Sequence, residues 1–447
     1  MKKRTKIILI ILSILIISAG IFAYNVYQMV MGSEDLSGKI DELPSEKSVS
    51  NLIQSGNSDW TNWRGVNFDG KSNFVGLKTD WSKSLKKLWQ IDYLCQGDAT
   101  ATWSAPVIKG NRLVISGRDN DSDLVFCINT DDGKVIWMSS YKSLAETSHG
   151  PGARATAIID ESRVYTFGRS GDVVCWNLDN GTEIWHKNVN ELGGIEPQWG
   201  HSATPLILDD KLIVQGGGKS LVISYNKING NVLWKSMEGD AGYSASVPFV
   251  IENDTTILVY HGKALSCLEA ESGNELWRVP WETEYGVNAT TPIISGNIIF
   301  HTSAYGMGGE AIEATKDNYK VLWKNDVISA QHSDPILIDG YLYCYAGESL
   351  RNKGLFKCVE LQTGKEMWSS DQIGQGTITF VDGHIICLDL KGNLYLIKPN
   401  NEKFEKIGEL KNAIEDVGNL AWTVPVVANG KLYLRYLQRL VCYDISK

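Results

Sequence analysis

The sequence predicts an all-β fold, an eight-bladed β-propeller made of four-stranded antiparallel blades. Three observations predict it. Tryptophans recur at spacings of 43 to 49 residues, short apolar runs divided by turn signals recur with the same period, and the two ends of the array complement each other. The repeat tryptophans are Trp89, Trp137, Trp185, Trp234, Trp277, Trp323 and Trp368. We expect each to cover the interface to a neighbouring blade, which is a structural role.

Each repeat unit can be divided into four short strands. In the third unit an apolar inner strand at 202–208 is followed by strands at 211–215 and 221–225, and a fourth strand ends at Trp234. The turn before that last strand is Asn229-Gly230-Asn231, and Asn-Gly between apolar runs is a strong hairpin signal. The same order begins at eight positions, namely Pro106, Ala157, Pro205, Pro248, Pro292, Pro335, Ile378 and Pro425.

The two ends of the array predict how the ring closes. The last unit stops after its third strand, at 439–444, and lacks a fourth. An unpaired fourth strand at 86–92, carrying Trp89, precedes the first unit. We therefore expect residues 86–92 to complete the eighth blade, which would remove open sheet edges.

Composition excludes some classes of function. The chain has 447 residues and a net charge of −9, and no basic run lies beyond its first six residues, so we expect no nucleic-acid surface. Of the eight cysteines, Cys127, Cys175, Cys267, Cys358 and Cys442 occupy one repeat position. Such positions are a blade apart, too far for a disulfide, so free buried thiols are expected.

The amino terminus predicts export or anchoring. Basic residues at 2–6 precede an apolar run from Ile7 to Ala23, which predicts an apolar helix. We interpret residues 1–31 as an uncleaved membrane anchor, residues 32–58 as a flexible polar stalk and residues 59–447 as the propeller. The alternative is a signal segment cleaved after Gly20 or Ala23, which would give a secreted protein. In either case the propeller lies outside the cytoplasm.

The repeat resembles a known family. The phrase Asp/Asn-Gly-Lys-x-x-Trp, as in Asp132-Gly133-Lys134-Val135-Ile136-Trp137, and the Ser/Thr-x-Pro-x-Ile inner strand resemble the PQQ-like (pyrroloquinoline quinone) repeat over residues 86–447. This repeat occurs in quinoprotein alcohol dehydrogenases and in an outer-membrane assembly lipoprotein. The segment at 60–70 resembles the opening motif Trp-x-x-Phe-Arg-Gly-Pro-Asn-x-Asp-Gly of exported "PQQ-binding-like" propellers, with Trp63 for Phe and Val66 for Pro.

The resemblance does not extend to the quinoprotein cofactor site. Those enzymes carry a vicinal Cys-Cys disulfide, and many carry a Cys-x-x-Cys-His haem motif, whereas this sequence has neither. No motif places a general base or calcium ligands, so we predict no catalytic residues, no metal site and no cofactor. PQQ with Ca²⁺ is the cofactor that the repeat alone would imply.

Candidate ligand-binding residues come from the loops that lead into the inner strands. These loops lie at one mouth of the central channel, and residues three or four places before the Pro position depart from the repeat consensus. The candidates are Trp103, Arg154, His201, Asn288, His332, Gln375 and Trp422. They predict a polar, anion-binding mouth with two tryptophan faces. The alternative is that these side chains fill the channel, hydrogen-bonded to one another and to water. The Gly/Pro-rich loops at 148–152 and 196–200 are expected at the surface.

Three functions remain open. The favoured one is a membrane-anchored binding or scaffold module, expected to be monomeric, for a protein or peptide partner in the cell envelope. The second is a propeller that binds a carbohydrate or another small ligand, and the third is a PQQ-dependent oxidoreductase. The sequence names no partner or substrate.

Overall fold

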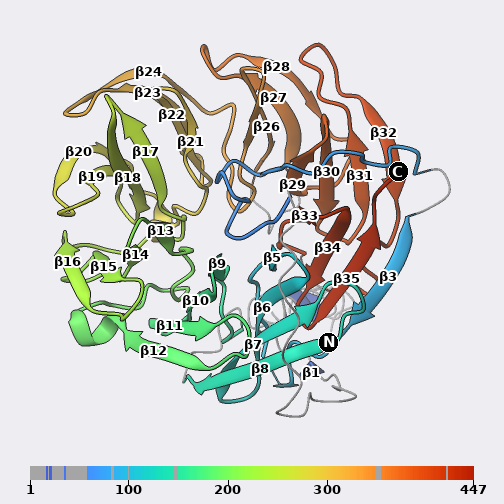
Figure 1. Cartoon of the computed structure of the whole chain (residues 1–447). Coiled ribbons are helices and arrows are strands. Elements are labelled where there is room, and N and C mark those ends of the chain that lie inside the picture. The colour runs from blue at the N-terminus through green and yellow to red at the C-terminus, as the bar shows by residue number, and fades with distance from the viewer. Residues whose placement is uncertain are drawn as a thin grey trace, which may run out of the picture.

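The computed structural model describes residues 17–18, 20–22, 35–36, 58–81, 85–98, 100–143, 150–347, 354–418 and 421–447. They form an eight-bladed β-propeller, and Figure 1 shows the blades arranged as a ring. Within each blade consecutive strands pair antiparallel, because tight turns join neighbouring strands. The predicted fold class is confirmed.

The blades follow the chain in order. Blade 1 contains β5 (Val107–Lys109), β6 (Arg112–Arg118), β7 (Ser122–Asn129) and β8 (Val135–Lys142). Blade 2 contains β9 (Ile158–Asp160), β10 (Arg163–Phe167), β11 (Asp172–Asn177) and β12 (Glu183–Asn188). Blade 3 contains β13 (Leu206–Leu208), β14 (Lys211–Gln215), β15 (Val222–Asn226) and β16 (Val232–Ser236). Blade 4 contains β17 (Val247–Ile251), β18 (Asp254–His261), β19 (Ala264–Glu269) and β20 (Glu275–Pro280).

The second half of the ring repeats this order. Blade 5 contains β21 (Ile293–Ser295), β22 (Ile298–Ser303), β23 (Gly308–Ala314) and β24 (Tyr319–Asn325). Blade 6 contains β25 (Ile336–Ile338), β26 (Tyr341–Ala346), β27 (Leu355–Glu360) and β28 (Glu366–Ser370). Blade 7 contains β29 (Gly376–Val381), β30 (His384–Asp389), β31 (Leu394–Ile397) and β32 (Lys406–Leu410). Blade 8 contains β33 (Val426–Ala428), β34 (Lys431–Tyr436), β35 (Arg439–Asp444) and β3 (Lys86–Ile91).

The ring closes as the sequence predicts. Strand β3, from the start of the ring, pairs antiparallel with β35 from its end, and Trp89 faces Cys442 in the register. Figure 1 shows the blue strand β3 beside the red strand β35. This pairing supplies the fourth strand of blade 8 and leaves no gap in the ring.

The repeat tryptophans join neighbouring blades. The indole Nε1 of each donates a hydrogen bond to a backbone carbonyl of the next blade, at Thr130, Leu178, Lys227, Ala270, Thr315, Leu361 and Asn400 in order, over 2.7 to 3.2 Å. A register shift next to the tryptophan recurs in the outer strand pairs, for example between Cys127 and Ile128. Each repeat tryptophan therefore joins its blade to the next one through the same hydrogen bond.

The hydrophobic core lies between the blades. One cluster joins Val125 of blade 1 to Val174 of blade 2, and another joins Leu258 of blade 4 to Ile299 of blade 5. All eight cysteines are buried and free, as expected. Burial raises the pKa of the Cys267 thiol to about 11, which keeps this side chain protonated.

A segment that we call the strap, residues 58–81, precedes the ring and crosses one end of the channel. Trp60 pairs with Ile108 of blade 1, and the carbonyl of Thr61 accepts from the backbone N–H of Ile159 in blade 2. Further along, β2 (Lys71–Ser72) adds as a parallel strand to β29 of blade 7. These contacts lie at the carboxyl ends of the inner strands, so the strap covers that end of the channel.

The predicted anchor and stalk fall mostly outside the described residues. In the anchor segment the structure describes residues 17–18 and 20–22, which are helical, and no helix of the described residues is long and apolar enough to cross a membrane. In the stalk segment β1 (Asp35–Leu36) pairs with β4 (Gly97–Asp98). The domain boundaries at 31 and 58 therefore stay predictions.

Candidate functional site

The end of the channel where the inner strands begin holds a cavity of about 590 Å³, which we call the cup. Its lining is rich in aromatic side chains, namely Trp63, Trp103, Trp199, Tyr243, Tyr285, Tyr305 and Trp422. The polar lining side chains are Arg154, Thr156, Gln198, Ser202, Thr204, Gln331 and His332, and Ala245, Val287 and Ala289 complete it. Concave sites with an apolar wall and a few polar groups are typical of ligand binding.

Four of the seven candidate residues line the cup. Trp103, Arg154, His332 and Trp422 come from blades 1, 2, 6 and 8, and the ring brings them together. They converge because each stands four places before the first residue of its inner strand. The propeller places equivalent positions of different blades around one mouth.

The other three candidates lie behind the cup. The amide nitrogen of Asn288 donates to the carbonyls of His261 and Trp281, at 2.8 and 3.0 Å. Gln375 accepts from the backbone N–H of Gly354 and donates to the carbonyl of Gly347. Asn288 and Gln375 therefore hold loops in place through bonds to the backbone, a role that neither interpretation of the sequence gave them.

His201 is the third candidate outside the lining. Its ring lies 4.9 Å from that of Phe167, and the side chain is buried. Burial lowers the pKa of His201 to about 4, so the imidazole is neutral at pH 7. Within the described residues its Nε2 atom has no hydrogen-bond partner.

Two tryptophans and a histidine form one wall of the cup. The ring centroids of Trp103 and Trp422 are 4.8 Å apart, and the ring of His332 lies 5.1 Å from that of Trp422 at an interplanar angle of 30°. Trp103 and Trp422 belong to neighbouring blades across the point of closure, so the same pairing that seals the ring also forms this wall. Such faces suit a flat or apolar group.

The floor of the cup comes from the strap. Trp63 reaches into the channel and donates from Nε1 to Oγ1 of Thr291, at 3.0 Å. Thr291 in turn donates to Asp334, which forms a buried ion pair with Arg64 of the strap, at 3.0 Å. A chain of polar contacts therefore fixes the floor between blades 5 and 6.

Several lining residues lie at no repeat position, and the repeat alone could not identify them. Trp199 follows the 3₁₀ helix η1 (Val189–Leu192), while Tyr285 lies in η2 (Glu284–Gly286). The loop at 196–200 lies at the surface as expected, with Gln198 exposed, and Gln198 and Trp199 also line the cup. The opening motif has an aromatic residue at the place of Trp63, and this signal could have identified Trp63 as a candidate.

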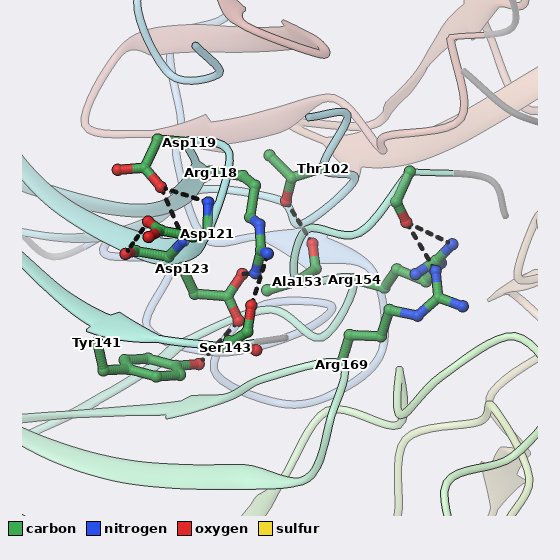
Figure 2. Close-up of polar contacts among 12 residues, drawn as sticks. Thr102, Arg118, Asp119, Asp121, Asp123, Tyr141, Ser143, Ala153, Arg154 and Arg169 are labelled. Atoms are coloured by element: carbon green, nitrogen blue, oxygen red, sulfur yellow. Dashed lines mark hydrogen bonds and ion pairs between the residues drawn. The ribbon is translucent and has the colours of Figure 1, made fainter. Parts of the chain in front are cut away.

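Arg154 is the arginine that lines the cup, and Arg169 lies beside it. Nη2 of Arg154 and Nη1 of Arg169 both donate to the carbonyl oxygen of Gly150, at 3.2 and 2.8 Å, and Figure 2 shows both side chains converging there. Arg169 also pairs with Glu196, at 3.3 Å. Burial, together with the neighbouring charge of Arg169, lowers the pKa of Arg154 to about 9, so Arg154 is still charged at pH 7.

A second polar cluster near these arginines has a structural role. Arg118 and Asp123 form a fully buried ion pair at 3.1 Å, and Tyr141 donates to the same carboxylate (Figure 2). Burial raises the pKa of Asp123, while the charge of Arg118 opposes that rise. None of these three side chains lines the cup.

The donor set of the cup does not fit a calcium-bound quinone. A calcium ion takes six to eight oxygen ligands, with carboxylates among them, and none of the described residues that line the cavity is an Asp or a Glu. Across the described residues no group of three His, Cys, Asp or Glu side chains is placed to hold a metal ion. The lining suits recognition by aromatic faces, amides, hydroxyls and one guanidinium.

Comparison with known proteins places the chain in a family. A family model described as the outer membrane protein assembly factor BamB matches residues 142–370 and 261–447. The chain belongs to this family. The resemblance to PQQ-like repeat propellers is thereby confirmed. A family of assembly factors also agrees with the prediction that no cofactor is required.

Individual relatives agree with this assignment. The outer membrane protein assembly factor BamB of Yersinia pestis is 23% identical over 298 residues, which cover 60% of this chain and 68% of the relative. The crystal structure of BamB from Moraxella catarrhalis has a TM-score of 0.59 at 14% identity and covers 80% of this chain and 99% of that one.

Quinoprotein enzymes share the fold as well. Quinohemoprotein alcohol dehydrogenase from Comamonas testosteroni has a TM-score of 0.61 at 12% identity and covers 87% of this chain and 81% of that one. At this identity the likeness shows the propeller alone, because unrelated functions share such folds.

Proposed function

We propose that this protein is an extracytoplasmic, membrane-anchored propeller that binds a segment of a partner protein of the cell envelope in the cup. The observation that carries the proposal is the cup itself, a cavity of about 590 Å³ with seven aromatic side chains in its lining. Tyrosine and tryptophan are enriched where proteins bind proteins, because they offer large apolar faces and polar tips.

The family supports the location and the kind of partner. The matched model and the Yersinia pestis relative are named as assembly factors of outer membrane proteins. The basic and apolar start of the chain, at 2–23, supports an anchor at the same place.

A small-molecule or carbohydrate ligand is the second candidate. The volume of the cup lies within the range of pockets that enclose small ligands, roughly 300–1,000 Å³. The amides of Gln198 and Gln331 and the hydroxyl of Tyr305 lie in the same lining, and such groups can bind sugar hydroxyls.

Site-specific photo-crosslinking in cells tests the first proposal. A photoreactive phenylalanine replaces Tyr285, which is 57% exposed at the rim, in the full-length membrane-bound chain. The matched control carries the same group at Val321, 46% exposed on the outer strand β24. We expect a discrete crosslinked envelope protein from position 285 that is missing from position 321.

The result can also contradict the proposal. Equal crosslinking from the two positions would show that the rim has no preference for a partner. If the crosslinked product at position 285 persists unchanged when Trp103 and Trp422 are both replaced by alanine, the cup is not part of the interface with the partner.

A further inference from the structure

The described part of the stalk segment lies at the end of the channel that holds the cup, which we call the cup end. Strand β1 (Asp35–Leu36) pairs with β4 (Gly97–Asp98). Just before β4, the backbone N–H of Gln96 donates to the carbonyl of Arg118, the last residue of β6. Because β6 runs antiparallel to the inner strand β5, it ends at the level where β5 begins, which is the level of the cup.

The strap meets the ring at the opposite end, which we call the strap end. The side chain of Ser58 accepts the backbone N–H of Asn429, in the turn after the inner strand β33. The carboxylate of Asp59 accepts the N–H of Gly110, in the turn after β5. Since β1 precedes the strap in the chain, β1 rather than the strap sets how far the ring can move from an anchor.

The tether between anchor and ring is short. The predicted anchor ends at residue 31 and β1 begins at residue 35, a span of about 14 Å for a fully extended chain. The five-residue inner strand β17 is about 17 Å long, and the eight-residue β7 about 26 Å. Because the tether starts at the cup end and is shorter than the ring is tall, the strap end cannot be the end that meets the membrane.

A gap of this size also limits what can enter the cup. A helix with its side chains is about 10–12 Å across, whereas a folded domain of about 100 residues has a radius of gyration of about 13 Å and is more than twice as thick. The space between the cup and the bilayer therefore admits a helix or an extended segment and excludes a folded domain.

From the place of β1 and the short tether we infer that the cup faces the membrane that holds the anchor, and that it binds a juxtamembrane segment of a protein inserted in that same membrane. This inference rests on the proposed function and names the kind of partner. The seven aromatic side chains of the cup suit it, because membrane-spanning segments end in apolar and aromatic residues.

Fluorescence quenching in vesicles tests the orientation. All eight native cysteines are buried, so a thiol-reactive bimane dye labels an introduced cysteine, and the chain without one is the blank. Ile195, whose N–H donates to Gly216 beyond the end of β14 at the cup end, and Val250, near the strap end of β17, are both 64% exposed. The full chain with Ile195→Cys or Val250→Cys is reconstituted in phosphatidylcholine vesicles that contain nitroxide-headgroup lipid. We expect quenching at position 195 at least about twofold stronger than at 250, since the length of β17 separates the two ends by about 17 Å.

Two insertions test whether β1 is the point of attachment. A Gly-Ser linker of about 20 residues, with a mean span of about 25 Å, is inserted between residues 32 and 33 or between residues 45 and 46. The first insertion lengthens the tether and should remove the difference in quenching between positions 195 and 250. The second lies after β1 and should leave the difference unchanged. Loss of the difference with the second insertion would overturn the inference.

The kind of partner is tested by the crosslink from position 285. Mass spectrometry should place the crosslinked residue of the captured protein within about 10 residues of a membrane-spanning segment, a distance of about 15 Å along a helix. A crosslinked residue in a soluble domain, or a product with lipid alone, would refute the partner that we infer.

Failure of the inference can be told apart from failure of the proposed function. A chain that floats with the vesicles but is quenched equally at positions 195 and 250 keeps its anchor and refutes the orientation. A chain that does not float with the vesicles refutes the anchor, and the inference with it. Equal crosslinking from positions 285 and 321 refutes binding in the cup, and with it the juxtamembrane partner, whatever the quenching shows.

Discussion

The indole ring of Trp81 lies against the backbone of Gly408. Gly408 faces Leu396 in blade 7 at the register position where Trp368 faces Cys358 in blade 6, so blade 7 lacks a repeat tryptophan. A Cβ atom added to Gly408 would lie 3.3 Å from Cδ2 of Trp81. The strap therefore supplies, from outside the repeat, the aromatic side chain that blade 7 does not encode.

Replacement of Trp81 should destabilise the ring. Trp81 is 4% exposed and packs in the cluster that joins blades 7 and 8, so Trp81→Ala should lower the free energy of unfolding by about 3–5 kcal/mol. Urea unfolding followed by far-ultraviolet circular dichroism measures this loss. Val75→Ala, at a strap position 75% exposed, is the control and should change stability by less than about 0.5 kcal/mol. Equal effects of the two substitutions would show that the strap does not support blade 7.

Two glycines allow a matched test of the contact between the turns and the tryptophans. Gly364 and Gly383 both have positive φ, 70° and 77°, so alanine costs each about 1 kcal/mol of backbone strain. An added Cβ at Gly364 would come within 2.6 Å of the ring of Trp323, but at Gly383 it would meet no atom within 4 Å. Gly364→Ala should therefore cost more than Gly383→Ala, by about 1–3 kcal/mol. Equal thermal midpoints would contradict this.

Loss of one partner of the buried ion pair beneath the cup should destabilise the protein more than loss of both partners. Arg64→Met leaves the carboxylate of Asp334, 6% exposed, without its guanidinium and should cost about 3–5 kcal/mol. In the double variant Arg64→Met/Asp334→Asn no buried charge is left, and the amide can still accept from Thr291. We expect the double variant to be more stable than the single one in urea unfolding. A less stable double variant would refute the argument.

Acid should destabilise the fold through His201. The folded state holds its pKa at about 4, below the ordinary value of 6.5, so the unfolded chain binds a proton more readily. Stability from this residue is complete above pH 6.5 and decreases as the pH falls towards 4, by an amount on the order of 3 kcal/mol. His201→Gln should reduce the loss of thermal midpoint between pH 7 and 4.5, whereas the half-buried His384→Gln should not. The same slope in both variants would contradict this role.

The fold could be predicted because the repeat encodes its own contacts. Each repeat tryptophan covers an interface between blades, and each Asn-Gly or Asp-Gly turn connects two strands of one blade. Because these roles recur in successive blades, the period and the turn residues are sufficient to predict the fold. The pairing of β3 with β35 was also predictable, because a missing fourth strand and a surplus strand stand at opposite ends of the array.

The candidate site was predictable only where it uses repeat positions. Trp103, Arg154, His332 and Trp422 stand at one such position, and the ring geometry alone brings them to the mouth. Trp199, Tyr243 and Tyr285 lie in connections of irregular length, whose path depends on tertiary packing rather than on period. Position alone also could not separate Arg154, which lines the cup, from Gln375, whose amide is used to hold a loop.

The pairing of β3 with β35 determines how late in synthesis the ring can close. The partner of residues 86–91 is residues 439–444, so the ring stays unsealed until nearly the whole sequence has left the ribosome. Until then β3 has no partner strand, and blade 1 has no neighbour on that side. Contacts between such distant segments form slowly, and exposed strand edges can pair wrongly in the meantime. A growing chain of this protein therefore cannot seal its ring before its last strand has been made.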